Sequence, residues 1–156
     1  MTRGLGIVAG LAIGLAIAAC AAKGGAGAPK WQISMDKKQE ITALWTQIRD
    51  WRREAHMEVE PSSGTLQYAR GMTVRQAAET CPDSHVPPPS CNDICDLADA
   101  ICDNAENICG IAGEMPDDIW AREKCDSAKA SCKEAKQQCC GCNDDATKAA
   151  RTEELQ

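Results

Sequence analysis

The sequence predicts an all-α protein, a small helical bundle stapled by disulfides. Three observations predict this fold class: cysteines repeated at helical spacing, an amphipathic stretch ahead of them, and a shortage of large apolar side chains. The chain has 156 residues, of which 11 are cysteine and one is tyrosine, and it has no phenylalanine. A core this lean needs covalent cross-links to hold its fold.

Two runs of cysteines predict an antiparallel helical hairpin, with helices at about 91–112 and 118–140. Within each run the cysteines recur every seven residues, so their sulfurs follow one stripe of a helix. A break at Gly113-Glu114-Met115-Pro116 separates the runs. Cysteines equally far from the break face each other across a hairpin. The pairs predicted in this way are Cys109–Cys125, Cys102–Cys132 and Cys95–Cys139.

Alanines between the cysteines lie on the same stripe of each helix, and the two stripes together form the seam along which the helices meet. They alternate with the cysteines at heptad spacing on both helices, and small side chains let two helices approach closely enough for disulfides. These alanines are Ala98, Ala105 and Ala112 in the first helix and Ala121, Ala128 and Ala135 in the second. Continuing the alanine series by seven residues on each helix reaches Cys91 and Cys142, which are therefore predicted to pair. Cys140 is then left to pair with Cys81. These last two pairings are open, since Cys140 and Cys142 could exchange partners.

A long helix is predicted at about 36–57, before the hairpin. Its apolar residues recur at steps of three and four on one stripe: Ile41, Leu44, Trp45, Ile48, Trp51 and Ala55. Trp45 and Trp51 are interpreted as core residues, with an aromatic ligand platform as the alternative. The stripe is expected to pack on the isoleucines of the first hairpin helix. The result is a three-helix bundle with a short fourth helix.

The segment between the long helix and the hairpin is predicted to hold a loop and the short helix. Val59–Gly71 contains Pro61-Ser62-Ser63-Gly64 and is interpreted as a loop. The short helix, at about 74–81, begins with a capping box formed by Thr73 and Gln76. Pro87-Pro88-Pro89 is interpreted as a rigid connector, with a recognition motif as the alternative.

The N-terminus predicts export. Arg3 precedes an apolar run from Leu5 to Ala19, and 15 residues are too few to span a bilayer as a helix. Residues 1–19 are therefore interpreted as a signal peptide. Ile17-Ala18-Ala19-Cys20 resembles the lipobox of bacterial lipoproteins, which implies that Cys20 receives a diacylglyceryl group and becomes the mature N-terminus. An ordinary secretory signal followed by a chance cysteine is the alternative.

The resemblance to lipoproteins implies a membrane anchor at Cys20, because two or more acyl chains bind a bilayer stably. Ala21, in place of the Asp that favours inner-membrane retention in that family, implies the outer membrane. Residues 20–34 are assigned to the lipidated cysteine and a flexible tether, 35–142 to the Cys-rich helical domain, and 143–156 to a polar tail. The expected partners are the membrane, through the lipid on Cys20, and an envelope protein.

Net charge argues against nucleic acid as a partner. The chain carries a net charge of −6, and loss of Arg3 with the signal peptide would make it −7. Phosphate backbones are bound by clustered Lys and Arg, which an acidic chain lacks. Ten cysteines remain besides Cys20, and an even number in an exported chain is typical of a disulfide framework.

Catalysis is not predicted, and no cofactor is expected. The two histidines, His56 and His85, lie at a helix end and in a proline-rich segment, with no serine motif or carboxylate pair around either. Both are interpreted as surface polar residues.

Metal binding and thiol redox chemistry are the alternatives for the cysteines. Thiolates lining a helical bundle suit copper or zinc, and the chain loosely resembles exported Cys-rich copper-storage bundles. That class favours a cysteine step of four, which occurs here at Cys91 and Cys95. Cys139 and Cys142 form a C-x-x-C spacing, but without the βαβ context of thiol oxidoreductases. We therefore assign no metal site.

The tandem Cys-x6-Cys arrangement over roughly residues 36–142 resembles uncharacterised Cys-rich lipoproteins of bacterial envelopes. That resemblance implies no activity. The sequence therefore predicts a lipid-anchored, disulfide-rich structural or protein-interaction module of the cell envelope.

Overall fold

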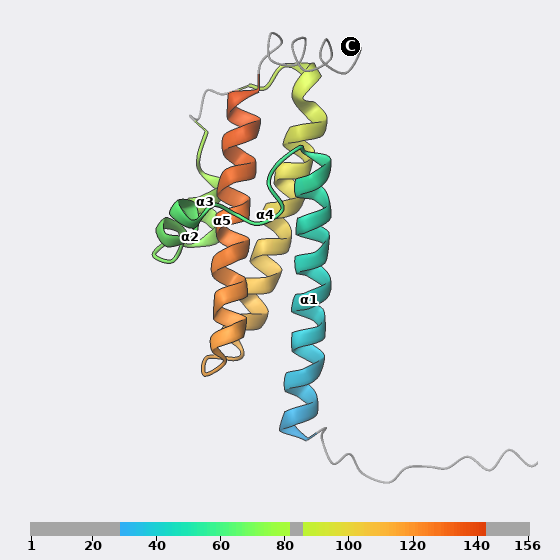
Figure 1. Cartoon of the computed structure of the whole chain (residues 1–156), viewed down its shortest axis with the longest axis vertical. Coiled ribbons are helices and arrows are strands. Elements are labelled where there is room, and N and C mark those ends of the chain that lie inside the picture. The colour runs from blue at the N-terminus through green and yellow to red at the C-terminus, as the bar shows by residue number, and fades with distance from the viewer. Residues whose placement is uncertain (1–28, 82–85, 143–156) are drawn as a thin grey trace, which may run out of the picture.

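The computed structural model describes residues 29–81 and 86–142, and within these ranges every regular element is a helix. Three long helices, α1 (Lys30–Glu54), α4 (Asn92–Gly113) and α5 (Ile119–Gly141), lie alongside one another (Figure 1). Two short helices, α2 (Ser63–Ala69) and α3 (Val74–Ala78), pack on α5 on the side away from α1. A 3₁₀ turn, η1 (Pro89–Cys91), leads into α4. The predicted all-α, disulfide-stapled bundle is confirmed.

The hydrophobic core lies between α1 and the α4–α5 hairpin. Ile41, Trp45 and Ile48 of α1 are buried against Ile101 and Ile108 of α4. These side chains recur at helical spacing on both helices, so each helix presents one apolar stripe to the other. The core interpretation of Trp45 and Trp51 fits this arrangement, because Trp45 is buried and Trp51 packs against the same cluster.

The first helix begins earlier than the apolar pattern indicated. α1 starts at Lys30, so residues 30–34, which we assigned to the tether, are helical. The side chains of Trp31, Ile33 and Met35 are exposed and contribute nothing to the core stripe. For that reason the periodicity of buried residues could not reveal this part of the helix.

The end of α1 is shaped by a residue in the left-handed region. His56 has φ 55°, its N–H donates to the carbonyl of Arg53, and the Met57 N–H donates to the carbonyl of Arg52. This pair of bonds is a Schellman motif, which satisfies carbonyls that the last helical turn leaves without partners. His56 therefore has a conformational role at an exposed chain reversal.

The segment 59–71, interpreted from sequence as a loop, contains the helix α2, which corrects that interpretation. Ser62 caps α2 by accepting a hydrogen bond from the Thr65 N–H at 3.2 Å. Ala69 of α2 is fully buried, so packing on α5 stabilises a helix too short to form alone. The capping box of Thr73 and Gln76 at α3 is present as predicted.

Candidate functional site

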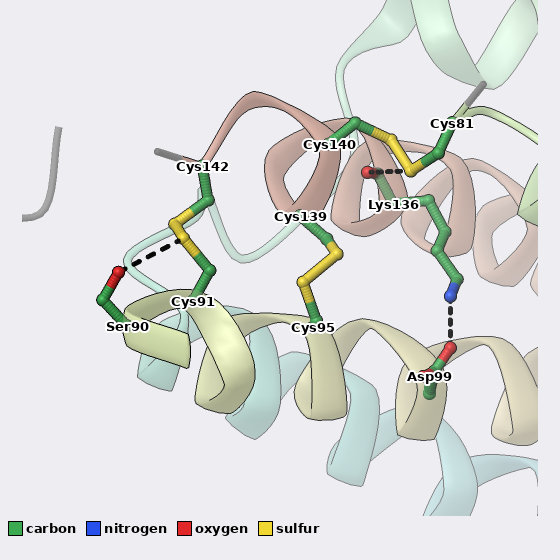
Figure 2. The surroundings of a disulfide bond; sticks show 9 residues. All are labelled: Cys81, Ser90, Cys91, Cys95, Asp99, Lys136, Cys139, Cys140 and Cys142. Carbon is green, nitrogen blue, oxygen red and sulfur yellow. Dashed lines mark hydrogen bonds and ion pairs between the residues drawn. A yellow bond between two sulfur atoms is a disulfide. The ribbon is translucent and has the colours of Figure 1, made fainter. Parts of the chain in front are cut away.

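The most distinctive feature of the molecule is a ladder of disulfides between α4 and α5. The described residues form five disulfides, four of them between the α4 and α5 sides and the fifth from Cys81 to α5, and they join the same partners that the cysteine spacing predicts. The pairs are Cys109–Cys125, Cys102–Cys132, Cys95–Cys139, Cys91–Cys142 and Cys81–Cys140. Figure 2 shows the end of the ladder where Cys81, on the chain after α3, reaches Cys140 on the side of α5.

The two helices approach closely along the ladder. The Cα atoms of the three inner pairs are 4.6 to 4.9 Å apart, near the lower end of what a disulfide allows. The alanine layers between them make this approach possible, since each of these side chains is at most 4 % exposed. These layers are Ala98, Ala105, Ala112, Ala121, Ala128 and Ala135. The seam of α4 and α5 is thus an alternation of cystine and alanine.

The pairing determines what the sulfurs can do. Cys139 and Cys142, which share the C-x-x-C spacing, each bond to a partner on the α4 side and not to each other. In this state all ten sulfurs between Cys81 and Cys142 are used in structure, so a thiolate for metal or redox chemistry would first require reduction. Within residues 29–81 and 86–142, no group of three or more His, Cys, Asp or Glu side chains is arranged to hold a metal ion.

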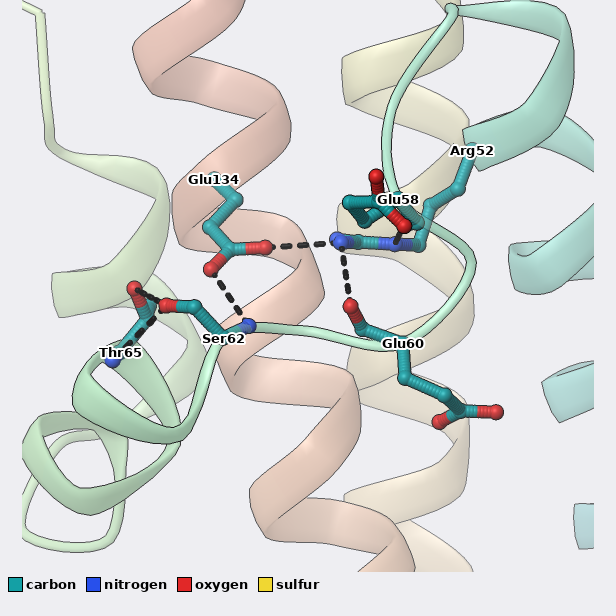
Figure 3. Close-up of polar contacts among 6 residues, drawn as sticks. All are labelled: Arg52, Glu58, Glu60, Ser62, Thr65 and Glu134. Atoms are coloured by element: carbon teal, nitrogen blue, oxygen red, sulfur yellow. Dashed lines mark hydrogen bonds and ion pairs between the residues drawn. The ribbon is translucent and has the colours of Figure 1, made fainter.

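A second cluster, which the sequence analysis missed, joins α1 to α5 through charge. Arg52 is 1 % exposed, and its Nε donates to the carbonyl of Glu58 at 2.7 Å. Its Nη2 donates to the carbonyl of Glu60 at 3.2 Å and to Glu134 Oε2 at 2.7 Å. Glu134 Oε1 accepts from the Ser62 N–H at 2.9 Å, which brings the α1–α2 loop onto α5 (Figure 3).

Electrostatics favour the ionised form of Glu134. Partial burial opposes ionisation, but hydrogen bonds from the Arg52 guanidinium and from the Ser62 backbone outweigh it, so the pKa of Glu134 lies below its ordinary value. The sequence did carry a signal for this cluster. Arg52 lies four residues after Ile48 on the buried stripe of α1, where a charged side chain requires a partner.

Further polar contacts fix the remaining helices on α5. The buried Lys129 donates from Nζ to the carbonyl of Met72 at 3.1 Å, and Gln138 Nε2 donates to the carbonyl of Ala55 at 2.7 Å. Lys136 pairs with Asp99 of α4, so an ion pair also spans the hairpin. These contacts give Lys129, Lys136 and Gln138 structural roles.

One end of the molecule exposes apolar side chains. The described chain has six large apolar residues that are clearly exposed, and four of them lie at the end where α1 begins and the α4–α5 turn is located (Figure 1). They are Trp31, Ile33, Met35 and Ile119. An open groove beside them is lined by Met35, Thr42 and Ala43 of α1 and by Trp120 of α5.

The remaining predicted sites lie outside the described residues. They are Cys20, the signal peptide 1–19, His85 and the tail 143–156. His56 is exposed and acts in the Schellman motif of α1. Among the helices of the described ranges, none is long and apolar enough to cross a membrane.

Comparison with known proteins gives no relative. No protein-family model matches the chain, and no curated protein or solved structure matches it.

Proposed function

We propose that this chain is a lipid-anchored, disulfide-rich structural or protein-interaction module of the bacterial cell envelope, without a catalytic role. The observation that supports it most is the five-disulfide ladder, since frameworks of this density occur in exported proteins that fold in oxidising compartments. The motif Ile17-Ala18-Ala19-Cys20 supplies the anchor in this proposal.

The arrangement suits a scaffold. With ten cysteines engaged in cross-links, the domain presents a rigid surface whose shape does not depend on a large apolar core. A partner would bind that outer surface, because the seam between α4 and α5 is filled by alanine and cystine. The partner we propose is another envelope protein, and the site of attachment is the outer membrane.

Labelling cells with radioactive palmitate tests the anchor. We expect label on the wild-type protein and its recovery with outer-membrane fractions, and we expect both to be lost in Cys20→Ser. Release of an unlabelled, soluble wild-type protein would contradict the anchor and favour an ordinary secretory signal.

Intact mass tests the ladder against metal storage. Five disulfides lower the mass by about 10 Da relative to the all-thiol chain, and an alkylating reagent adds nothing until a reductant is present. Ten alkylated thiols without reductant, or copper or zinc released by acid, would instead support the metal-binding alternative.

A further inference from the structure

We propose that the exposed apolar end of the bundle is a second membrane contact, at which Trp31 inserts into the interfacial zone of the bilayer that anchors Cys20. This inference rests on the proposed lipidation. It assigns a role to four exposed apolar side chains at one end of the bundle, Trp31, Ile33, Met35 and Ile119, hereafter the apolar end.

The connection to Cys20 determines which surface faces the lipid. Nine residues, 21–29, separate Cys20 from Lys30, where α1 begins. A segment of this length reaches at most about 30 Å. The end of α1 that carries Trp31 is therefore the part of the described domain held nearest the anchor.

The residue types at this end match a bilayer interface. Trp31 is 66 % exposed, and tryptophan prefers the boundary between acyl chains and headgroups. Met35 and Ile119 are also more than half exposed, so this end offers apolar surface that water solvates poorly. Exposed apolar side chains gain nothing in water, whereas a domain tethered beside lipid could bury them.

Charge indicates that apolar burial drives the contact. Lys37 pairs with Glu114 at 2.6 Å, and Lys38 pairs with Asp118 at 2.6 Å. The other charged side chains of this end, at Lys30, Asp36 and Asp117, carry both signs. A nearly balanced charge gives little attraction to anionic headgroups, so binding should be insensitive to lipid charge.

Bromine quenching of tryptophan fluorescence tests the contact. The lipidated full chain is reconstituted in phosphatidylcholine vesicles whose acyl chains carry bromine near the headgroup. The chain also carries Trp45, Trp51 and Trp120, so the signal of Trp31 is the difference between the wild type and Trp31→Phe. We expect quenching of that difference, so Trp31→Phe loses this component. Moving the reporter, by adding Tyr68→Trp to Trp31→Phe, should not restore it, because Tyr68 is 63 % exposed but lies on α2 at the side of the bundle (Figure 1).

The membrane affinity of the full chain without lipid, Cys20→Ser, measures the contribution of the apolar end separately from that of the anchor. We expect Trp31→Ala to weaken its partitioning into phosphatidylcholine vesicles about tenfold, equivalent to about 1.4 kcal/mol. The matched control, Tyr68→Ala, should change it less than about twofold. Replacing part of the lipid with phosphatidylglycerol should have little effect.

The outcomes separate this inference from the lipoprotein proposal. A lipidated protein whose Trp31 is not quenched overturns the inference and leaves the anchor intact. A wild-type protein that cells make without lipid refutes the anchor, and partitioning that still depends on Trp31 then keeps the contact. Self-association that Trp31→Ala abolishes, without quenching by lipid, would assign the apolar end to a second copy and also overturn it.

Discussion

Arg52 of α1 donates a 2.7 Å hydrogen bond to Glu134 of α5, although 82 positions separate them in the chain. The same guanidinium holds the carbonyls of Glu58 and Glu60, and Glu134 also accepts from Ser62. One partly buried ion pair therefore holds the chain leaving α1 where it crosses to α2.

Replacing Glu134 with glutamine should destabilise the domain. Glu134→Gln leaves the charge of Arg52 buried without its counterion, and we expect a loss of about 2 kcal/mol in the free energy of unfolding. Urea unfolding followed by circular dichroism, with the disulfides intact, measures this loss. Glu79→Gln is the matched control, because the Arg75–Glu79 pair is exposed to solvent and should contribute little to stability. Equal losses in the two variants would contradict the role of Arg52 and Glu134.

Acid should weaken the same contact. The pKa of Glu134 is lower in the folded state than its ordinary value of 4.5, so the unfolded chain binds this proton more readily. The contribution of Glu134 to stability is therefore complete above about pH 4.5 and is lost as pH falls through the lower, folded-state pKa. Unfolding temperatures measured between about pH 6 and pH 2 should fall less steeply in Glu134→Gln than in the wild type. Parallel curves would be evidence against this assignment.

The disulfides should differ in which helices they stabilise. Removing the innermost pair, with Cys109→Ala and Cys125→Ala, should lower the free energy of unfolding in urea by about 2 kcal/mol, because the Cys102–Cys132 bond already closes the surrounding loop.

Removing Cys81–Cys140 with two alanines should instead raise amide hydrogen exchange in α3. Protection of α4 and α5 should remain, since the four disulfides between them persist. A uniform rise in exchange over all three helices would refute this division.

Close packing of the seam predicts intolerance to larger side chains. Ala105 is fully buried, and Ala105→Leu should destabilise the domain by about 2 kcal/mol because the helices cannot separate without straining the disulfides. Gly110→Ala is the control on the same helix. A Cβ at Gly110 meets nothing within 4 Å, so it should stabilise α4 by about 0.5 to 1 kcal/mol. Thermal unfolding of the two variants should shift in opposite directions.

His56 should be replaceable by glycine with a gain in stability. Its φ of 55° is strained for a residue with a side chain and is free of strain for glycine. We expect His56→Gly to raise the free energy of unfolding by about 0.5 to 1 kcal/mol, whereas His56→Ala keeps the strain and gains nothing. Differential scanning calorimetry compares the two. Destabilisation by His56→Gly would indicate that the imidazole itself makes a needed contact.

The hairpin could be predicted from sequence because its constraint is repeated. A heptad step carried by both cysteine and alanine leaves one antiparallel register, and the structure has the same partners on each rung, from Cys109–Cys125 outward. The apolar stripe of α1 was readable for a similar reason, since Ile41, Trp45 and Ile48 recur at helical spacing in the buried core.

Other features depend on single contacts between residues far apart in the chain, and local sequence patterns do not predict such contacts. The helix α2 is seven residues long and contains Gly64, so its formation depends on the Ser62 cap and on packing against α5. The pairing of Arg52 with Glu134 required knowing that the two helices lie side by side. The start of α1 at Lys30 was hidden because its first turns face outward.

The disulfide ladder reaches only from Cys81 to Cys142, and the sequence between Cys20 and Cys81 contains no cysteine. α1 is therefore held to the bundle by side-chain packing and hydrogen bonds, while α4 and α5 are locked covalently. If α1 is the helix joined to the anchor, mechanical tension along the tether reaches it before any cystine. A pulling force would peel α1 away and lengthen the chain by the extension of residues 30–80, after which the cross-linked remainder would act as a stop. Attachment at Cys20 would thus combine an extensible segment with an inextensible one in a single domain.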